Sequence, residues 1–169
     1  VRPRMPPPPR PLKKGKAPTT ATPEQLHARQ RGALFGLAIG EAMGLRNDTR
    51  NTPCADFPAL NDGPIAEPLG GGRFELPRGR VSWASEMACA LSISLRNKRV
   101  YDVLEVGRAY TRWLPTAVDA PDAVKQACEG IAEGRSPENV GRKVWIENQM
   151  RLRDNGSLAR TLPIGVFFH

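Results

Sequence analysis

The tripeptide Asn155-Gly156-Ser157 contains the residue types of a turn that contacts a ligand. Glycine adopts positive φ and allows a ligand to approach the backbone, while asparagine and serine supply hydrogen-bond donors and acceptors. The same three residues also form an ordinary helix start, with Ser157 as the N-cap. The residues alone leave both interpretations open, a substrate-binding turn and a helix cap.

Other residues with chemical potential give weaker signals. The segment Gly70-Gly71-Gly72-Arg73 could cradle a phosphate, but it lacks the lysine and the following helix of a P-loop, so we expect a flexible loop. His27 and His169 have no companions at metal-ligand spacing, and we expect both at the surface. The three tryptophans are expected to be packing residues: Trp83, Trp113 and Trp145.

Length and composition limit the class of protein. A chain of 169 residues with 40% hydrophobic residues favours one domain with a real core. No apolar run approaches the roughly 18–20 residues of a membrane-spanning helix, so no membrane partner is expected. The opening residues contain no apolar core of a secretory signal. The cysteines are odd in number and scattered, which argues against a disulfide framework or zinc site and favours a reducing, cytoplasmic setting: Cys54, Cys89 and Cys128.

Residues 1–23 differ from the rest of the chain. They contain eight of the seventeen prolines and six basic residues with no acid, and they account for six of the eight net positive charges. Proline fixes φ and lacks a backbone donor, so we expect a disordered, proline-rich basic tail at 1–23 and a helical domain at 24–169. Nucleic-acid binding is not expected outside this tail, because the domain is nearly neutral.

The first expected helix begins after Thr22, where Pro23 and Gln25 complete a capping box, and it runs to about Met43. Within it, a glycine recurs at every fourth position from residue 32 to residue 44. Each glycine costs about 1 kcal/mol of helix propensity relative to alanine. Such a stripe is tolerable where another helix or a ligand approaches the backbone closely. We therefore expect a buried, tightly packed helix.

Residues 45–80 lack periodicity and are expected to be a long loop. Beyond it, caps and apolar periodicity predict further helices. These are expected from Ser82 to about Lys98, from Asp102 to Trp113, from the residue after Pro121 to Gly134 and from Ser136 to about Met150, followed by an apolar segment at Leu158–Phe167. Few β-branched alternations occur, so we predict an all-α fold.

Three segments resemble, in order, motifs of the ADP-ribosylglycohydrolase family. Arg31–Gly44 resembles the opening helix R-G-A-L-x-G-L-A-x-G-D-A-L-G. Ser82–Leu91 resembles the helix T-D-D-T-x-M-A-L-A-L, and Asn155–Gly165 resembles N-G-S-L-M-R-x-x-P-L-G. The resemblance implies an orthogonal all-α bundle that cleaves ADP-ribose from a protein side chain or a related adduct, with two Mg²⁺ ions in its cleft.

The resemblance also implies substrate-binding residues. Glu41 matches an aspartate near the metal and the ribose, and Asn155, Gly156 and Ser157 match a substrate-contacting turn. An exposed acid at a helix end is the alternative for Glu41. These four residues are the candidate site, and we expect an ADP-ribose-type ligand there.

The metal motif is degenerate in this chain. Magnesium prefers oxygen ligands in octahedral geometry, and a two-metal centre needs several of them. Where the family has T-D-D-T, this chain has Ser82-Trp83-Ala84-Ser85, and the indole and methyl side chains supply no oxygen. Sliding the alignment to place Glu86 on an aspartate would take Met87 and Leu91 out of register with the apolar face. We therefore expect no metal ligands and no cofactor.

A second loss concerns length. Family members continue to a D-x-D-T motif that completes the metal cluster, whereas this sequence ends at His169. We therefore expect an incomplete bundle, a degenerate glycohydrolase-like protein that is inactive alone.

Two alternatives stay open. A second chain, or a homo-oligomer, could complete the bundle and restore hydrolysis of ADP-ribose from a modified protein. Alternatively, the chain is a non-catalytic interaction or assembly protein that uses its proline-rich basic tail.

Overall fold

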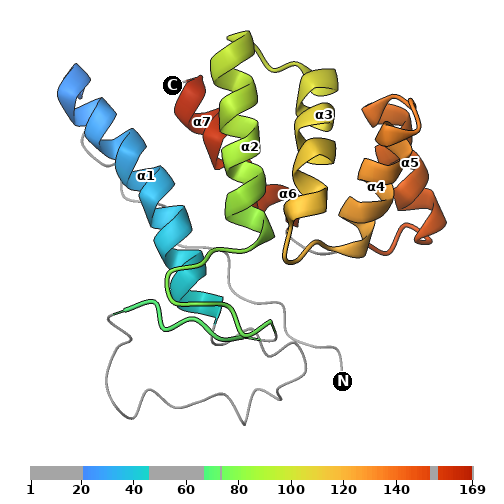
Figure 1. Cartoon of the computed structure of the whole chain (residues 1–169). Helices are drawn as coiled ribbons and strands as arrows, with labels where there is room; N and C mark the ends of the chain where they lie inside the picture. Colours follow the sequence, from blue (N-terminus) through green and yellow to red (C-terminus); the bar gives the residue numbers. More distant parts are fainter. Residues whose placement is uncertain (1–20, 46–66, 73, 153–155, 169) are drawn as a thin grey trace, which may run out of the picture.

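A computed structural model describes residues 21–45, 67–72, 74–152 and 156–168, and most of these residues are in helices (Figure 1). The helices are α1 Pro23–Gly44, α2 Trp83–Lys98, α3 Val103–Trp113, the 3₁₀ helix η3 Leu114–Thr116, α4 Asp122–Ala132, α5 Pro137–Glu147, α6 Gly156–Ala159 and α7 Leu162–Phe167. These residues contain no strand beyond an isolated bridge, which confirms the all-α prediction. None of the helices described is long and apolar enough to cross a membrane. Of the tail expected at residues 1–23, residues 1–20 lie outside the described residues, and Pro23 begins α1.

Helix α2 is at the centre of the bundle (Figure 1). It packs against α3 on one side and against α7 and α1 on the other, while α4 and α5 continue outward from α3. The core is formed by Leu91 and Leu95 of α2 and by Val106 of α3. Partly buried apolar side chains pack on this cluster: Tyr110, Ile164 and Phe167.

The helix starts follow their local sequence signals. Thr22 and Gln25 form the expected capping box, Asp102 accepts from two backbone N–H groups of α3, and Ser136 accepts from the Asn139 N–H. These side chains satisfy backbone donors that have no partner within the helix. The starts were predictable because each cap lies within three residues of the group it binds.

The end of α5 differs from the prediction. Helix α5 stops at Glu147 rather than near Met150, because Gln149 and Met150 have φ values of 56° and 57°. The last apolar segment, for which no helix bounds were predicted, forms two short helices. Its second helix, α7, carries proline in its first turn, where the missing N–H costs least.

The prediction that the first helix is buried and tightly packed was wrong. Ala42 is the one buried residue of α1, while Phe35 is 66% exposed and Ile39 is 53% exposed. A Cβ added at each of the four glycines from residue 32 to residue 44 would meet nothing within 4 Å. Helix α1 contacts only α2 and α7 strongly, so none of the elements described covers its glycine-rich face.

The glycine segment at residues 70–72 is part of an ordered turn rather than the flexible loop expected. The backbone N–H groups of Gly71 and Leu76 each donate to the other residue's carbonyl, at 2.7 and 2.9 Å. Gly70 has a φ of 69°, and a Cβ there would lie 2.4 Å from the Leu76 carbonyl oxygen. Arg73 and most of the expected loop, residues 46–66, lie outside the described residues.

Helix α5 is held close to its neighbours by two glycines. A Cβ at Gly107 of α3 would lie 2.8 Å from Pro137 Cγ, and one at Gly130 of α4 would lie 3.0 Å from Val140 Cγ2. Real Cβ contacts this short essentially do not occur at the first position and are rare at the second. The close packing of α5 therefore depends on the absence of side chains at these two positions.

Candidate functional site

Glu41 reaches from the end of α1 to the first turn of α2. Its Oε1 accepts from the Ser82 hydroxyl at 2.6 Å, and its Oε2 accepts from the Ser85 backbone N–H at 3.0 Å. Free N–H groups and the helix dipole both favour a carboxylate at a helix N-terminus. Glu41 is therefore neither an exposed helix-end acid nor a carboxylate facing an open cleft. Its geometry is that of a capping group supplied by another helix.

The four positions that match the metal motif surround this cap. The Ser82 hydroxyl is bound to Glu41, and the Ser85 hydroxyl is buried without a hydrogen-bond partner. Trp83 and Ala84 contribute an indole and a methyl group. The first turn of α2 therefore supplies two hydroxyl oxygens and no carboxylate of its own between residues 82 and 85.

Glu86 does not replace the missing acids. Its Oε1 accepts from Arg80 at 2.9 Å, and its Oε2 accepts from the Trp113 indole N–H at 2.8 Å. Met87 and Leu91 are both buried on the core-facing side of α2. The helix therefore keeps the register of the original match, and the alternative alignment with Glu86 as a metal ligand has no support.

The residues described do not fit a pair of magnesium ions. Among them, no three histidine, cysteine or acidic side chains gather as a metal site would require. Both oxygens of Glu41 already accept hydrogen bonds, and both oxygens of Glu86 do so as well. Two Mg²⁺ ions need several converging oxygen ligands, which this part of the chain does not provide.

The predicted turn at the other end of the candidate site is only partly described. Asn155 lies outside the described residues. Gly156 is buried and begins α6, and Ser157 is exposed inside that short helix, so the prediction that Ser157 is an N-cap was wrong. Both residues line a cavity of about 280 Å³ together with Trp83. Glu41 is not among the residues that line it, so the cavity does not bring the candidate residues together.

That cavity involves two residues that are not among the four candidate site residues. Tyr110 of α3 and Arg160 after α6 both line it. The Arg160 guanidinium carbon lies 5.8 Å from the centre of the Tyr110 ring, and its Nη1 donates to the Met87 sulfur at 3.5 Å. No sequence signal joins residues so far apart in the chain. Tyr110 and Arg160 line the same cavity because the helices that carry or flank them pack together.

Burial controls the ionisation of two groups in this cavity. It raises the pKa of Tyr110 to about 12, although the Arg160 charge acts in the opposite direction. Burial also raises the pKa of the Cys128 thiol, again against the effect of Arg160. Both groups are therefore neutral at physiological pH.

The ionisation of Tyr110 gives a testable pH dependence. The ordinary tyrosine pKa is about 10, so the folded protein holds the neutral phenol more firmly than the unfolded chain does. This contribution to stability is complete below about pH 10 and is lost as the pH rises through the folded value. Ultraviolet titration of the phenolate should show a step near pH 12. Tyr110→Phe should remove that step, and its persistence in the variant would contradict the assignment.

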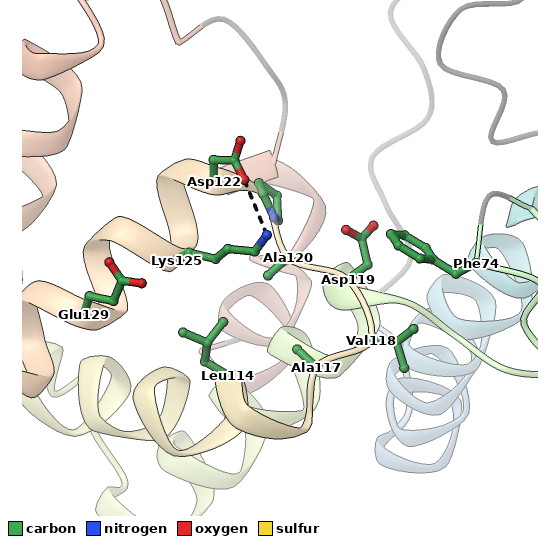
Figure 2. Close-up of a pocket in the computed structure, with 10 residues that line it drawn as sticks. Phe74, Leu114, Ala117, Val118, Asp119, Ala120, Asp122, Lys125 and Glu129 are labelled. Carbon is green, nitrogen blue, oxygen red and sulfur yellow. Dashed lines mark hydrogen bonds and ion pairs between the residues drawn. The ribbon is translucent and has the colours of Figure 1, made fainter.

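A larger pocket of about 560 Å³ lies beside the start of α4 (Figure 2). Asp119 and Phe74 lie on one side of it, and Lys125 and Glu129 of α4 lie on the other. The Lys125 ammonium is 3.4 Å from Asp122. Since the basic residue of this pocket is already paired with an acid, the pocket offers an anionic ligand no unpaired positive charge.

The remaining candidate residues have mixed outcomes. Trp83 and Trp113 are partly buried, but Trp145 is 46% exposed, so its prediction as a packing residue was wrong. Helix α5 has its core-facing side at Val140 and Val144, which directs Trp145 outward. His27 is exposed as predicted. Two predicted positions lie outside the described residues: Cys54 and His169.

Comparison with known proteins gives the family. The sequence profile of the ADP-ribosylglycohydrolase family matches residues 22–169. The chain belongs to the ADP-ribosylglycohydrolase family. The match includes α1, the degenerate start of α2 and the turn at Gly156, and so confirms the resemblance seen in the three sequence motifs.

Two curated relatives within the ADP-ribosylglycohydrolases show how much of the protein is present. The ADP-ribosylarginine hydrolase Tri1 of Pseudomonas putida (strain GB-1) is 28% identical over 153 residues, which is 88% of this chain and 38% of the relative. The ADP-ribosyl-[dinitrogen reductase] glycohydrolase of Rhodospirillum rubrum is 31% identical over 149 residues, 84% of this chain and 45% of the relative. The chain therefore spans less than half the length of either glycohydrolase.

Proposed function

We propose that this polypeptide, by itself, is a degenerate ADP-ribosylglycohydrolase that neither holds two Mg²⁺ ions nor hydrolyses ADP-ribosyl bonds. The observation that supports this proposal most strongly is that both carboxylate oxygens of Glu41 are occupied by hydrogen bonds from the start of α2. Its two oxygens accept from the Ser82 hydroxyl and the Ser85 N–H, so the one acid of α1 near the metal motif serves as a helix cap. The adjacent positions 83 and 84 provide no oxygen in its place.

The proposal is tested by metal binding and by hydrolysis. We expect isothermal calorimetry to show no saturable heat when Mg²⁺ or Mn²⁺ is added to the purified chain, and no release of ADP-ribose from ADP-ribosylarginine with Mg²⁺ present. The Pseudomonas putida hydrolase is the positive control, because its name states this activity. Binding of two ions per chain, or metal-dependent release of ADP-ribose by this chain alone, would overturn the proposal.

A second candidate function is hydrolysis by a complex in which another polypeptide completes the bundle. The exposed face of α1 favours this candidate, since Phe35 and Ile39 are open to solvent beside glycines that no side chain or helix of the described part approaches within 4 Å. Large apolar side chains that share one helix face commonly mark an interface. The occupant we infer is a helical polypeptide equivalent to the part of the relatives that this chain does not match, which is more than half of each.

The complex can be tested by co-expression. The partner is the segment of the Rhodospirillum rubrum glycohydrolase outside its match to this chain. We expect co-purification and Mg²⁺-dependent release of ADP-ribose, with at least a tenfold loss of association for the Phe35→Ser/Ile39→Ser variant. Ile146→Ser on α5 is the matched control, because Ile146 is similarly exposed on another helix. Self-association through α1 in place of this complex, or no association at all, would contradict the second candidate.

A further inference from the structure

The cavity beside Trp83 has the walls of a small-molecule site. It lies among α2, α3, α4, α5 and α6 and has a volume of about 280 Å³. Its walls include the aromatic rings of Trp83 and Tyr110 and the aliphatic side chains of Ile131 and Val144. Ligand pockets are typically apolar and aromatic with a few polar groups, and most are about 300–1,000 Å³. The volume therefore suits a small ligand of one or two rings.

Arg160 is the one charged residue among those that line the cavity. Among the described residues, its guanidinium donates to the Met87 sulfur at 3.5 Å and lies over the Tyr110 ring, 5.8 Å from the ring centre. Neither of these groups carries a negative charge, and no carboxylate among the described residues pairs with Arg160. Among the described residues Arg160 therefore has no counter-ion, and an anion that entered the cavity would form a charge-assisted interaction with it.

The other ionisable groups in the cavity do not neutralise Arg160. Burial raises the pKa of Tyr110 to about 12 and also raises the pKa of Cys128. Both side chains are therefore protonated at neutral pH, despite the positive charge nearby. The described residues that line the cavity carry one net positive charge, and the Ser157 hydroxyl is a further hydrogen-bonding group among them.

We propose that this cavity binds a small, planar aromatic carboxylate, with its ring against Trp83 and Tyr110 and its carboxylate on Arg160. Planar rings match the aromatic walls, and a guanidinium binds a carboxylate through two parallel hydrogen bonds. A single cation balances a monoanion, whereas the two phosphates and two ribose rings of ADP-ribose exceed both the charge and the volume of the cavity. The inference goes beyond the proposed function and does not depend on it, because neither metal binding nor hydrolysis enters.

The proposal is tested with a matched pair of ligands, 2-naphthoate and its neutral amide 2-naphthamide. The two molecules have nearly the same shape and differ in charge. We expect calorimetry with the full chain to show at least tenfold tighter binding of the carboxylate. Arg160→Gln should reduce this preference to less than threefold. Arg112→Gln is the control, because Arg112 is an exposed arginine whose partner is Glu105. The Arg112→Gln variant should bind both ligands with the affinities of the parent chain.

A second variant tests the location. Ala127 lines the cavity, so Ala127→Phe should fill it and abolish binding of both ligands, while circular dichroism checks that the helices are retained. The proposal is overturned if naphthoate binds no better than the amide, if neither binds, or if Arg160→Gln leaves the preference unchanged. It is also overturned if the folded Ala127→Phe variant keeps the parent affinity.

Discussion

Replacing Leu91 by alanine will lower the free energy of unfolding by about 2–5 kcal/mol. Leu91 is 2% exposed and packs with Leu95 and Val106 at the contact between α2 and α3. The substitution removes three carbon atoms from the centre of the core and leaves a cavity that the fixed helices fill only in part. Domains of this size have a total stability of about 5–15 kcal/mol, so the variant should lose a large share of it.

Urea denaturation followed by circular dichroism measures this effect. Ile93→Ala is the matched control, because Ile93 lies on the same helix and is 52% exposed. The control should cost less than about 1 kcal/mol, as surface substitutions usually do. Equal losses for the two variants would show that α2 is not packed as described.

Replacing Glu41 by alanine will cost about 2–3 kcal/mol of stability, since hydrogen bonds to charged groups are worth about 1.5–3 kcal/mol. The change leaves the Ser82 hydroxyl and the Ser85 N–H without their acceptor and removes a negative charge from the start of α2. Because Glu41 links α1 to α2, the variant should also loosen α1.

Thermal unfolding measures the loss, and hydrogen exchange of α1 amides measures the loosening. Glu138→Ala is the control, because Glu138 is an exposed acid in the first turn of α5 and should cost at most about 1 kcal/mol. The parent chain should melt at the same temperature with Mg²⁺ and with a chelator. A stabilising effect of Mg²⁺ that Glu41→Ala abolishes would identify Glu41 as a metal ligand instead of a cap.

Local signals account for the parts of the fold that could be predicted. The caps at Thr22, Asp102 and Ser136 each act on a backbone group within three residues, so the helix starts followed from the sequence. The exposure of α1 could not be predicted from the sequence, because the burial of a helix depends on which other elements cover it. A stripe of glycines shows that close approach is possible, and it does not show that an approaching helix is present.

Some features of the candidate site could be predicted from the sequence, and others depend on how the helices pack. The loss of carboxylates at Trp83 and Ala84 follows from residue type alone. The role of Glu41 depends on hydrogen bonds to residues 41 and 44 positions away, which no local pattern encodes. The Arg160 cavity combines five helices, and the sequence does not show that Arg160 lacks an acidic partner among the residues the structure describes.

The two glycines beneath α5 have a consequence for the cavity that α5 helps to enclose. Gly107 and Gly130 do not line this cavity, yet they determine how near α5 comes to α3 and α4. A methyl group at Gly107 would force Pro137 of α5 to shift, and one at Gly130 would require Val140 of α5 to move by a few tenths of an ångström. The width of the cavity therefore depends on two glycines that lie outside it and have no side chain.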